Sequence, residues 1–332
     1  MAGHGRGRRF GRRSTGTRRS VRAVLLAIAG GLTIALAAAP LAGAAPRYPE
    51  DFNFFSGIPY ELSNPGGSLP GTNNPRCKPS AAHPRPVVLV HGTGGGQQTN
   101  WGAYGGFLAN EGYCVYALTY GALPLPWPLT ALGGMGAQEQ SAQQLKVFID
   151  GVLAATGAKT VDLVGHSQGT LMPSYYLKHL GGATKVTNYV SLAPLWRGSG
   201  GALMEPVSRF IGRLGAQDKW VPVCAACGQM MPGSAFLDKV WSGGSPYVKG
   251  INYTNISTRY DEFVIPYISG QLPAQRPGEN VRNIVVQDTC ASDYSDHLAI
   301  AGSRRAAYMV LNALDPQRHI AVPCMFVPPL FG

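Results

Sequence analysis

The strongest constraint on the fold is a regular alternation of short apolar runs with longer helical stretches from residue 86 onward. The apolar runs are rich in β-branched residues and end in polar residues or glycine, as strands buried in a sheet do. The strands predicted in this way are Pro86–His91, Tyr113–Tyr120, Thr160–Gly165, Val186–Leu192, Ile251–Arg259 and Asn283–Gln287. The predicted helices are Gln98–Asn110, Gln138–Ala155, Thr170–Leu180 and Leu298–Leu314. This order predicts an α/β fold with a mostly parallel central sheet and helices on both faces.

Two stretches interrupt the alternation. Residues 46–85 are rich in Pro, Gly and Asn and are predicted to form an extended N-terminal segment that wraps round the domain. Residues 195–250 follow the fourth strand and are predicted to form a small cap-like insertion over one end of the sheet. Neither stretch reads as a linker, so residues 45–332 are expected to form a single domain.

Residues 1–44 are expected to be a signal peptide. Residues 1–22 hold eight arginines and no Asp or Glu, an apolar run continues to Ala39, and Ala42-Gly43-Ala44 provides small residues for cleavage. A transmembrane anchor is the alternative, but the apolar run is short and broken by glycines. The mature protein is therefore expected to be secreted without a stable membrane anchor, by either the Sec or the twin-arginine route.

The basic charge of the chain belongs to this leader. The whole chain has 28 Lys+Arg and 17 Asp+Glu, a net charge of +11, and without the eight leader arginines the balance is 20 against 17, or +3. A balance of this kind gives no basic footprint for nucleic acid, so no nucleic-acid partner is predicted. A monomer is expected, although the sequence does not give the oligomeric state.

Six cysteines in an exported chain favour disulfides over free thiols. Six cysteines allow 15 pairings, so the sequence alone does not settle the connectivity. Neighbouring predicted elements favour the pattern Cys77–Cys114, Cys224–Cys227 and Cys290–Cys324. The Cys-x-x-Cys pair could also suggest zinc, but no second such pair or His pair accompanies it, so no metal site is expected.

The motif Gly165-His166-Ser167-Gln168-Gly169 is the one match to G-x-S-x-G in the chain. It follows a predicted buried strand and opens a predicted helix, where a sharp turn can lift a serine hydroxyl out of the sheet. An ordinary glycine-rich loop is the alternative. The context favours Ser167 as a nucleophile, with flanking glycines that avoid collisions with neighbouring backbone.

A second glycine-rich loop, His91 to Gly96, follows the first predicted strand. Acyl transfer places negative charge on the carbonyl oxygen, and hydrogen-bond donors must already be waiting for it. The predicted donors are the backbone N–H groups of Thr93 and Gln168, with the Thr93 hydroxyl as a third. A phosphate-binding loop is the alternative, but the chain lacks the G-x-G-x-x-G spacing and the Walker lysine.

A nucleophilic serine needs a base and an acid, which follow it in the order acid, then His, in this type of fold. Asp261 follows a predicted strand and is the expected acid, with Glu262 and Asp288 as rivals. His297 lies just before the last helix and is the expected base. The other candidates, His83, His179 and His319, are less well placed.

Several segments resemble the secreted class 2 lipases of actinobacteria, a family of the α/β-hydrolase fold. They are PVVLVHGTGG around His91, GHSQG around Ser167, YTNISTRYDE around Asp261 and DHL around His297, and the resemblance runs from about Cys77 to Cys324. It implies an esterase or triacylglycerol lipase with Ser167, Asp261 and His297 as the catalytic triad. It implies no metal or organic cofactor.

The pair Thr93 and Gln168 is also similar to the oxyanion hole of Candida antarctica lipase B, which supports a role for the Thr93 hydroxyl. Apolar residues of the insertion and of the loop 122–132 are expected to bind acyl chains, although some of them could form a small satellite core. The sequence thus predicts a secreted serine hydrolase of apolar carboxylic esters that works at a lipid–water interface. An esterase or cutinase-like enzyme for short or polymeric esters, an acyltransferase and a non-catalytic binding module are the alternatives.

Overall fold

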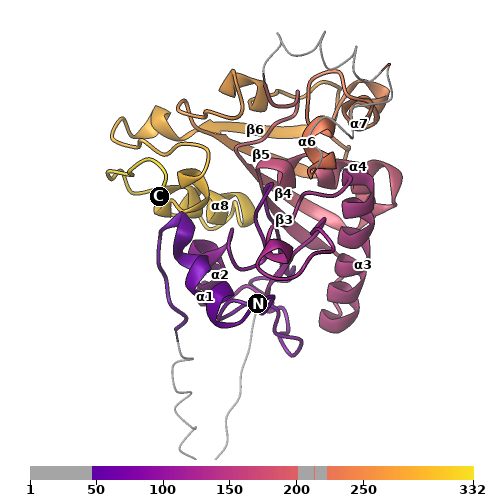
Figure 1. Cartoon of the computed structure of the whole chain (residues 1–332). Helices are drawn as coiled ribbons and strands as arrows, with labels where there is room; N and C mark the ends of the chain where they lie inside the picture. The colour runs from indigo at the N-terminus through magenta and orange to yellow at the C-terminus, as the bar shows by residue number, and fades with distance from the viewer. Residues whose placement is uncertain (1–46, 201–212, 214–222) are drawn as a thin grey trace, which may run out of the picture. The chain divides into compact units, whose positions relative to one another are not determined.

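The computed structural model describes residues 47–200, 213 and 223–332. Within these residues a six-stranded sheet has the order β2-β1-β3-β4-β5-β6, and every neighbouring pair is parallel (Figure 1). The strands are β1 (Val87–Val90), β2 (Val115–Leu118), β3 (Val161–His166), β4 (Val186–Leu192), β5 (Asn252–Ser257) and β6 (Asn280–Val285). The predicted parallel sheet is confirmed.

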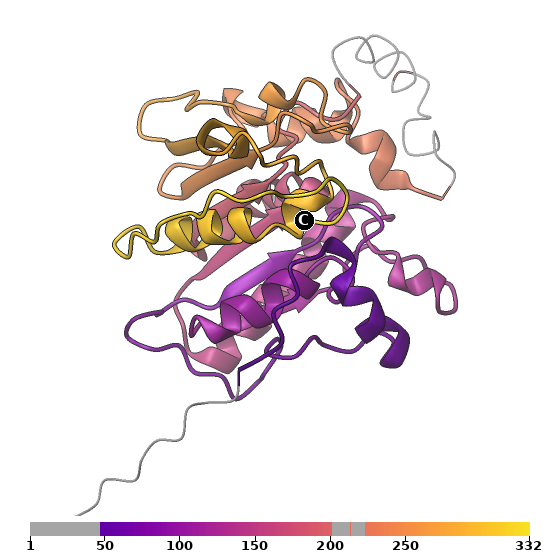
Figure 2. The same cartoon turned by 90° about the vertical axis from the view of Figure 1, so that its left-hand side faces the viewer.

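Helices cover both faces of the sheet, as predicted. They are α2 (Gly102–Asn110) and α8 (Arg304–Leu314) on one face, and α3 (Gln138–Thr156) and α4 (Met172–His179) on the other. Figure 2 shows α2 and α8 in front of the sheet. Alternate residues of β1 serve the two faces, because Val87 and Leu89 pack with α2 and α8 while Val88 packs with α3 and α4. All four residues of β1 are buried, as expected for a strand covered on both sides.

Residues 46–85 were expected to be extended, but the structure shows two short helices within them. These are η1 (Phe54–Gly57) and α1 (Ile58–Ser63). The Asn53 side chain accepts the Phe55 N–H and caps η1, and a proline lies in the first turn of α1. Helices this short show no periodic apolar pattern, so the sequence did not reveal them.

The expected helix Leu298–Leu314 is divided in two. A short turn, η10 (Ala299–Ala301), is followed by Gly302 and Ser303, and α8 begins only after them. The Ser303 side chain accepts the Ala306 N–H, which makes Ser303 the N-cap of a new helix. Similarly, the expected helix Gln98–Asn110 starts at Gly102, after a run of turns.

The cap-like insertion 195–250 is described in part. Its described helices are α6 (Ala225–Gln229), α7 (Ala235–Val240) and η7 (Ser242–Gly244). The predicted apolar residues Leu203, Met204, Phe210, Leu214 and Trp220 lie outside the described residues, as does the expected signal peptide. Phe236, Leu237 and Val240 pack with Leu171 and Val264 in a small separate cluster, so part of the insertion is a satellite core.

The remaining short helices are η2 (Leu129–Ala131), η3 (Ser167–Thr170), η4 (Gly182–Thr184), η8 (Tyr267–Gly270) and η9 (Val286–Thr289). Three disulfides join Cys77 to Cys114, Cys224 to Cys227 and Cys290 to Cys324, which confirms the predicted pairing. Of the helices in the described ranges, none has the length and apolar character needed to cross a membrane.

The turn between β3 and η3 brings three backbone segments very close together. A Cβ atom on Gly169 would lie 2.0 Å from the carbonyl oxygen of Val90, and one on Gly165 would lie 2.1 Å from that of Gly169. Real side chains do not fit at such distances. Both glycines of the motif are therefore required by contact with backbone, as the sequence predicted.

We expect Gly169→Ala to lower the free energy of unfolding by at least about 1–3 kcal/mol, because η3 must move away from β1. Gly151→Ala is a matched control in the middle of α3, where a Cβ atom meets nothing within 4 Å. It should raise stability by about 0.5–1 kcal/mol, since alanine has the better helix propensity. Urea unfolding followed by circular dichroism measures both, and equal stability of the two variants would contradict the close contact.

Candidate active site

Ser167 lies at the sharp turn where β3 ends and η3 begins. Its φ angle is 53°, in the left-handed region that residues with side chains seldom adopt. The preceding His166 is extended, with φ −123°. Strain of this kind at a strand-to-helix turn is typical of a serine held out for reaction.

The structure brings His297 and Asp261 to this serine from two other loops. Asp261 follows β5, and His297 lies between η9 and η10. The Ser167 Oγ is 2.8 Å from His297 Nε2, and His297 Nδ1 is 2.9 Å and 3.0 Å from the two carboxylate oxygens of Asp261. With the ring proton on Nδ1, the imidazole donates to Asp261 and accepts from Ser167, which is the arrangement of a general base.

The rival acids have other partners. The carboxylate of Glu262 accepts the backbone N–H of His297 at 3.1 Å, and so does not contact the imidazole nitrogens. Asp288 forms an ion pair with Arg259, and both side chains are more than half exposed to solvent. The carboxylate that contacts the imidazole is therefore that of Asp261.

The rival histidines lie in other surroundings. His179 Nε2 donates to the backbone carbonyl of Lys239, and the His83 ring lies against Tyr113 with centroids 3.9 Å apart. Neither makes a described hydrogen bond to Ser167.

The orientation of Asp261 is fixed by its own loop. Its Oδ1 accepts the backbone N–H groups of Phe263 at 3.0 Å and Val264 at 2.7 Å. The Phe263 ring then packs edge-on against the imidazole of His297, with centroids 5.0 Å apart. The carboxylate is thus buried and aimed at the histidine before any substrate arrives.

Two buried histidines support the loops around Ser167. Burial lowers the pKa of His91 to about 4, and burial together with the charge of nearby His297 lowers the pKa of His166 to about 3. Both rings are therefore neutral at ordinary pH. His91 stacks on Tyr120 and accepts the Tyr120 N–H, while His166 Nε2 donates to the carbonyl of His297 at 2.8 Å.

In the loop after β1, most of the backbone N–H groups near Thr93 are already paired. Gly92, Gly94 and Gly95 donate their N–H groups within the loop or to its neighbours. In the described chain the Thr93 N–H has no such partner. The Gln168 N–H lies in the first turn of η3, where N–H groups have no partner inside the helix. The Thr93 hydroxyl donates to Gln168 Oε1 at 2.7 Å, so its proton is already in use.

A cavity of about 620 Å³ opens over Ser167. Leu195, Met230 and Met231 from the insertion line one part of it, and Leu132 comes from the loop after β2, as the sequence suggested. Among the lining residues that belong to the described part of the chain there is no Asp, Glu, Lys or Arg. Across the described ranges, no group of three or more His, Cys, Asp and Glu side chains could hold a metal ion.

The lining residues that the sequence reasoning missed include Phe54, Phe55 and Ile58 of the N-terminal segment. The cluster of aromatic residues at 52–55 was the available signal, because such side chains in a polar stretch usually have a packing partner. His166 and Phe263 were also missed, although each lies within two residues of a predicted triad member.

Comparison with protein families now bears on this geometry. Residues 84–298 match the family model described as Lipase (class 2). The chain belongs to the class 2 lipase family. As a class 2 lipase it is a carboxylic ester hydrolase with the α/β-hydrolase fold.

A solved structure supports the fold. Lipase B of Aspergillus fumigatus is 18% identical, with a TM-score of 0.54, and the match covers 81% of this chain and 67% of that one. A Bacillus licheniformis lipase in its mature form is 14% identical, with a TM-score of 0.48 over 73% of this chain and 96% of that one. At these identities the first similarity shows the fold alone.

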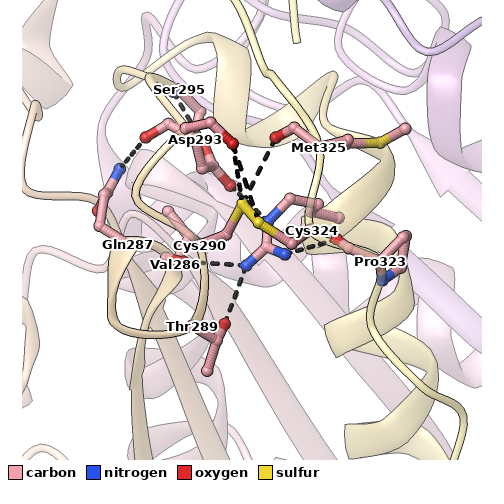
Figure 3. Close-up of a disulfide and its surroundings, with 11 residues drawn as sticks. Val286, Gln287, Thr289, Cys290, Asp293, Ser295, Pro323, Cys324 and Met325 are labelled. Carbon is pink, nitrogen blue, oxygen red and sulfur yellow. Dashed lines mark hydrogen bonds and ion pairs between the residues drawn. A yellow bond between two sulfur atoms is a disulfide. The ribbon is translucent and has the colours of Figure 1, made fainter.

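In this class 2 lipase the loop that carries His297 is restrained by a disulfide and by a buried arginine. Figure 3 shows the Cys290–Cys324 disulfide with Asp293, Thr289 and Pro323 around it. Arg305 of α8 is fully buried, and its guanidinium donates to the Asp293 carboxylate, the Thr289 hydroxyl and the backbone carbonyls of Val286 and Pro323. A buried arginine needs such complete pairing, because an unpaired buried charge is costly.

The disulfides provide a matched test of this restraint. The Cys290–Cys324 and Cys77–Cys114 bonds span 34 and 37 residues, so each should contribute about 3–4 kcal/mol by restricting the unfolded chain. Replacing either pair by alanine should lower stability to a similar extent in urea unfolding. Only the loss of Cys290–Cys324 should also lower kcat, by roughly tenfold or more, because this bond restrains the loop that carries His297.

The activity comparison uses p-nitrophenyl butyrate at a temperature where both double variants are folded. An equal fall in kcat for the two would show that the Cys290–Cys324 bond acts on stability only.

Proposed function

We propose that this protein is a secreted serine hydrolase that cleaves apolar acyl esters, triacylglycerols among them, through an acyl-enzyme on Ser167. The observation that carries this proposal is the hydrogen-bonded series Ser167, His297, Asp261 at the floor of an apolar cavity. Binding modules have no need of such a series.

In the proposed reaction, His297 Nε2 takes the proton of Ser167 as Oγ attacks the ester carbonyl carbon. The oxygen of the tetrahedral intermediate receives hydrogen bonds from the backbone N–H groups of Thr93 and Gln168. The imidazolium then gives its proton to the leaving alcohol, and the acyl-enzyme remains. Water then attacks the acyl carbon while His297 takes its proton, and the imidazolium returns a proton to Ser167 Oγ as the carboxylic acid is released.

The chemistry of the cavity wall supports apolar substrates. Its described lining consists mostly of aliphatic, aromatic and sulfur-containing side chains, and none of these described residues offers a formal charge to a phosphate or a carboxylate. The hydroxyl-rich surface of a sugar would leave polar groups unpaired there. Acyl chains would bury their methylenes against it.

The surface around the cavity supports work at a lipid–water interface. No charged residue lies between Glu111 and Glu139, and none lies between Glu262 and Arg276. These two segments and the N-terminal helices expose apolar side chains, namely Phe55, Ile58, Leu62, Leu125, Trp127, Leu129, Leu132, Phe263, Ile265 and Ile268. Exposed apolar residues gathered round a site favour contact with an apolar surface.

Export also belongs to this proposal. Residues 1–44 have the sequence features of a signal peptide, and three disulfides suit an oxidising compartment outside the cytoplasm. We propose that residues 45–332 are the mature single-domain enzyme, that it works as a monomer, and that it needs no cofactor.

The triad proposal predicts the activity of three variants. Ser167→Ala and His297→Ala should each lower kcat by roughly 10⁴ or more. Asp261→Asn should retain roughly 10²-fold more activity than these, because the acid orients and stabilises the imidazole without taking part in bond making. Initial rates on p-nitrophenyl butyrate measure all three.

Asp288→Asn is the control, since that carboxylate lies at the surface in an ion pair with Arg259 and should be dispensable. If Asp288→Asn is inactive while Asp261→Asn is active, the acid of the triad is Asp288 and the proposed assignment to Asp261 is wrong.

The substrate proposal predicts a dependence on chain length. Each methylene buried in the cavity should raise kcat/KM by up to about fourfold, until the cavity is filled. The measurement uses p-nitrophenyl esters from C2 to C16, with emulsions of tributyrin and triolein. A sharp optimum at acetate, with no hydrolysis of either triglyceride, would make this protein a short-ester esterase and remove the lipase proposal.

A further inference from the structure

The backbone of His297 lies in an irregular loop, where no helix or sheet ladder satisfies its polar groups. The residues from Tyr294 to Leu298 belong to no helix or strand. Side chains must therefore pair the N–H and the C=O of this buried residue, because unpaired buried backbone groups are costly.

Two side chains do this, one at each side of the residue. The carboxylate of Glu262 accepts the His297 N–H at 3.1 Å, and Nε2 of His166 donates to the His297 carbonyl at 2.8 Å. Glu262 directly follows Asp261 in the chain, and His166 directly precedes Ser167. The backbone of the histidine is thus bonded to the immediate neighbours of both groups that its imidazole must reach.

We infer that His166 and Glu262 are positioning residues that hold His297 by its backbone, so that Nδ1 meets Asp261 and Nε2 meets Ser167. This inference rests on the proposed triad and adds two residues to it. Any shift of the turn at Ser167 or of the loop at Asp261 is transmitted to His297, and the three groups move together. Misplacement by about 1 Å is enough to cost an enzyme roughly 10²-fold in rate.

The two holding groups differ in their own surroundings. His166 is buried, lies edge-on to Phe54 with centroids 6.0 Å apart, and has its Nδ1 3.1 Å from the amide oxygen of Asn100. Its position is therefore fixed by packing. Glu262 is exposed to solvent, so its carboxylate can be changed with little effect on the core.

The exposed residue gives the cleaner experiment. Glu262→Gln keeps an oxygen that accepts the His297 N–H, whereas Glu262→Met has a similar length and no acceptor. We expect Glu262→Met to lower kcat roughly tenfold with KM for p-nitrophenyl butyrate within about twofold of the wild type. Glu262→Gln should recover most of this loss.

A parallel pair tests the buried residue. His166→Gln offers an amide N–H in place of Nε2, and His166→Met offers none. The same order is expected, with kcat of His166→Met lower than that of His166→Gln. The double variant His166→Met/Glu262→Met should lose less than the product of the two single losses, because both bonds act on one residue.

A spectroscopic readout separates positioning from general damage. The proton between His297 Nδ1 and Asp261 should give a downfield proton NMR signal in the wild type and in both Gln variants. The signal should weaken or vanish in the Met variants, although thermal unfolding shows them folded.

Ser167→Ala, measured in parallel, separates failure of this inference from failure of the proposed function. If Ser167→Ala is inactive while Glu262→Met keeps wild-type kcat and the NMR signal, the backbone contacts do not position the histidine. If the His166 variants fail to fold, the Glu262 pair alone decides. An active Ser167→Ala would instead overturn the triad on which the inference rests.

Discussion

The common direction of the strands is the constraint on which the whole site depends. Because β3, β5 and β6 are parallel, their carboxyl ends lie at one edge of the sheet and the loops that follow them can meet there. Neighbouring strands are about 4.8 Å apart, so β6 lies roughly 14 Å from β3, across three intervals. The loop after η9 must therefore carry His297 back over β5 and β4 before its imidazole can reach Ser167.

A loop that spans this distance needs several interactions to fix its conformation, and hydrogen bonds from β5, η9 and α8 provide them. The hydroxyl of Thr258, at the end of β5, donates to the carbonyl of Ser295, and Gln287 Nε2 donates both to Thr258 Oγ1 at 2.9 Å and to the Asp293 carbonyl at 3.0 Å. The loops that carry Asp261 and His297 are thus joined to each other by hydrogen bonds outside the proposed triad. The buried Arg305 ties the same assembly to α8. The position of the His297 imidazole therefore depends on all of these hydrogen bonds and not on the conformation of its own loop alone.

The sequence predicted the parts of this arrangement that follow from periodicity and order. The strand Val186–Leu192 was predicted with its observed bounds, and the motif around Ser167 placed the serine at the end of the third strand. It favoured Asp261 as the acid but left Glu262 as a rival, since the two are adjacent in the sequence and differ in what their side chains contact. It also joined η10 to α8, because the serine cap that separates them is a local hydrogen bond and leaves the apolar pattern intact.

The wall of the cavity shows a different limit of local reasoning. Phe54 and Phe55 lie more than 100 residues before Ser167 in the sequence, yet both line the cavity above it. Their place depends on the far end of the chain, because the Phe54 N–H donates to the carbonyl of Phe331 and the Phe55 ring packs edge-on against the Phe331 ring at 5.8 Å. Gly302 admits this contact, since a Cβ atom there would lie 2.3 Å from the Phe331 carbonyl oxygen. The groups of the proposed triad thus come from the loops of the sheet, while part of the cavity wall comes from segments near the two ends of the described chain that hold each other in place.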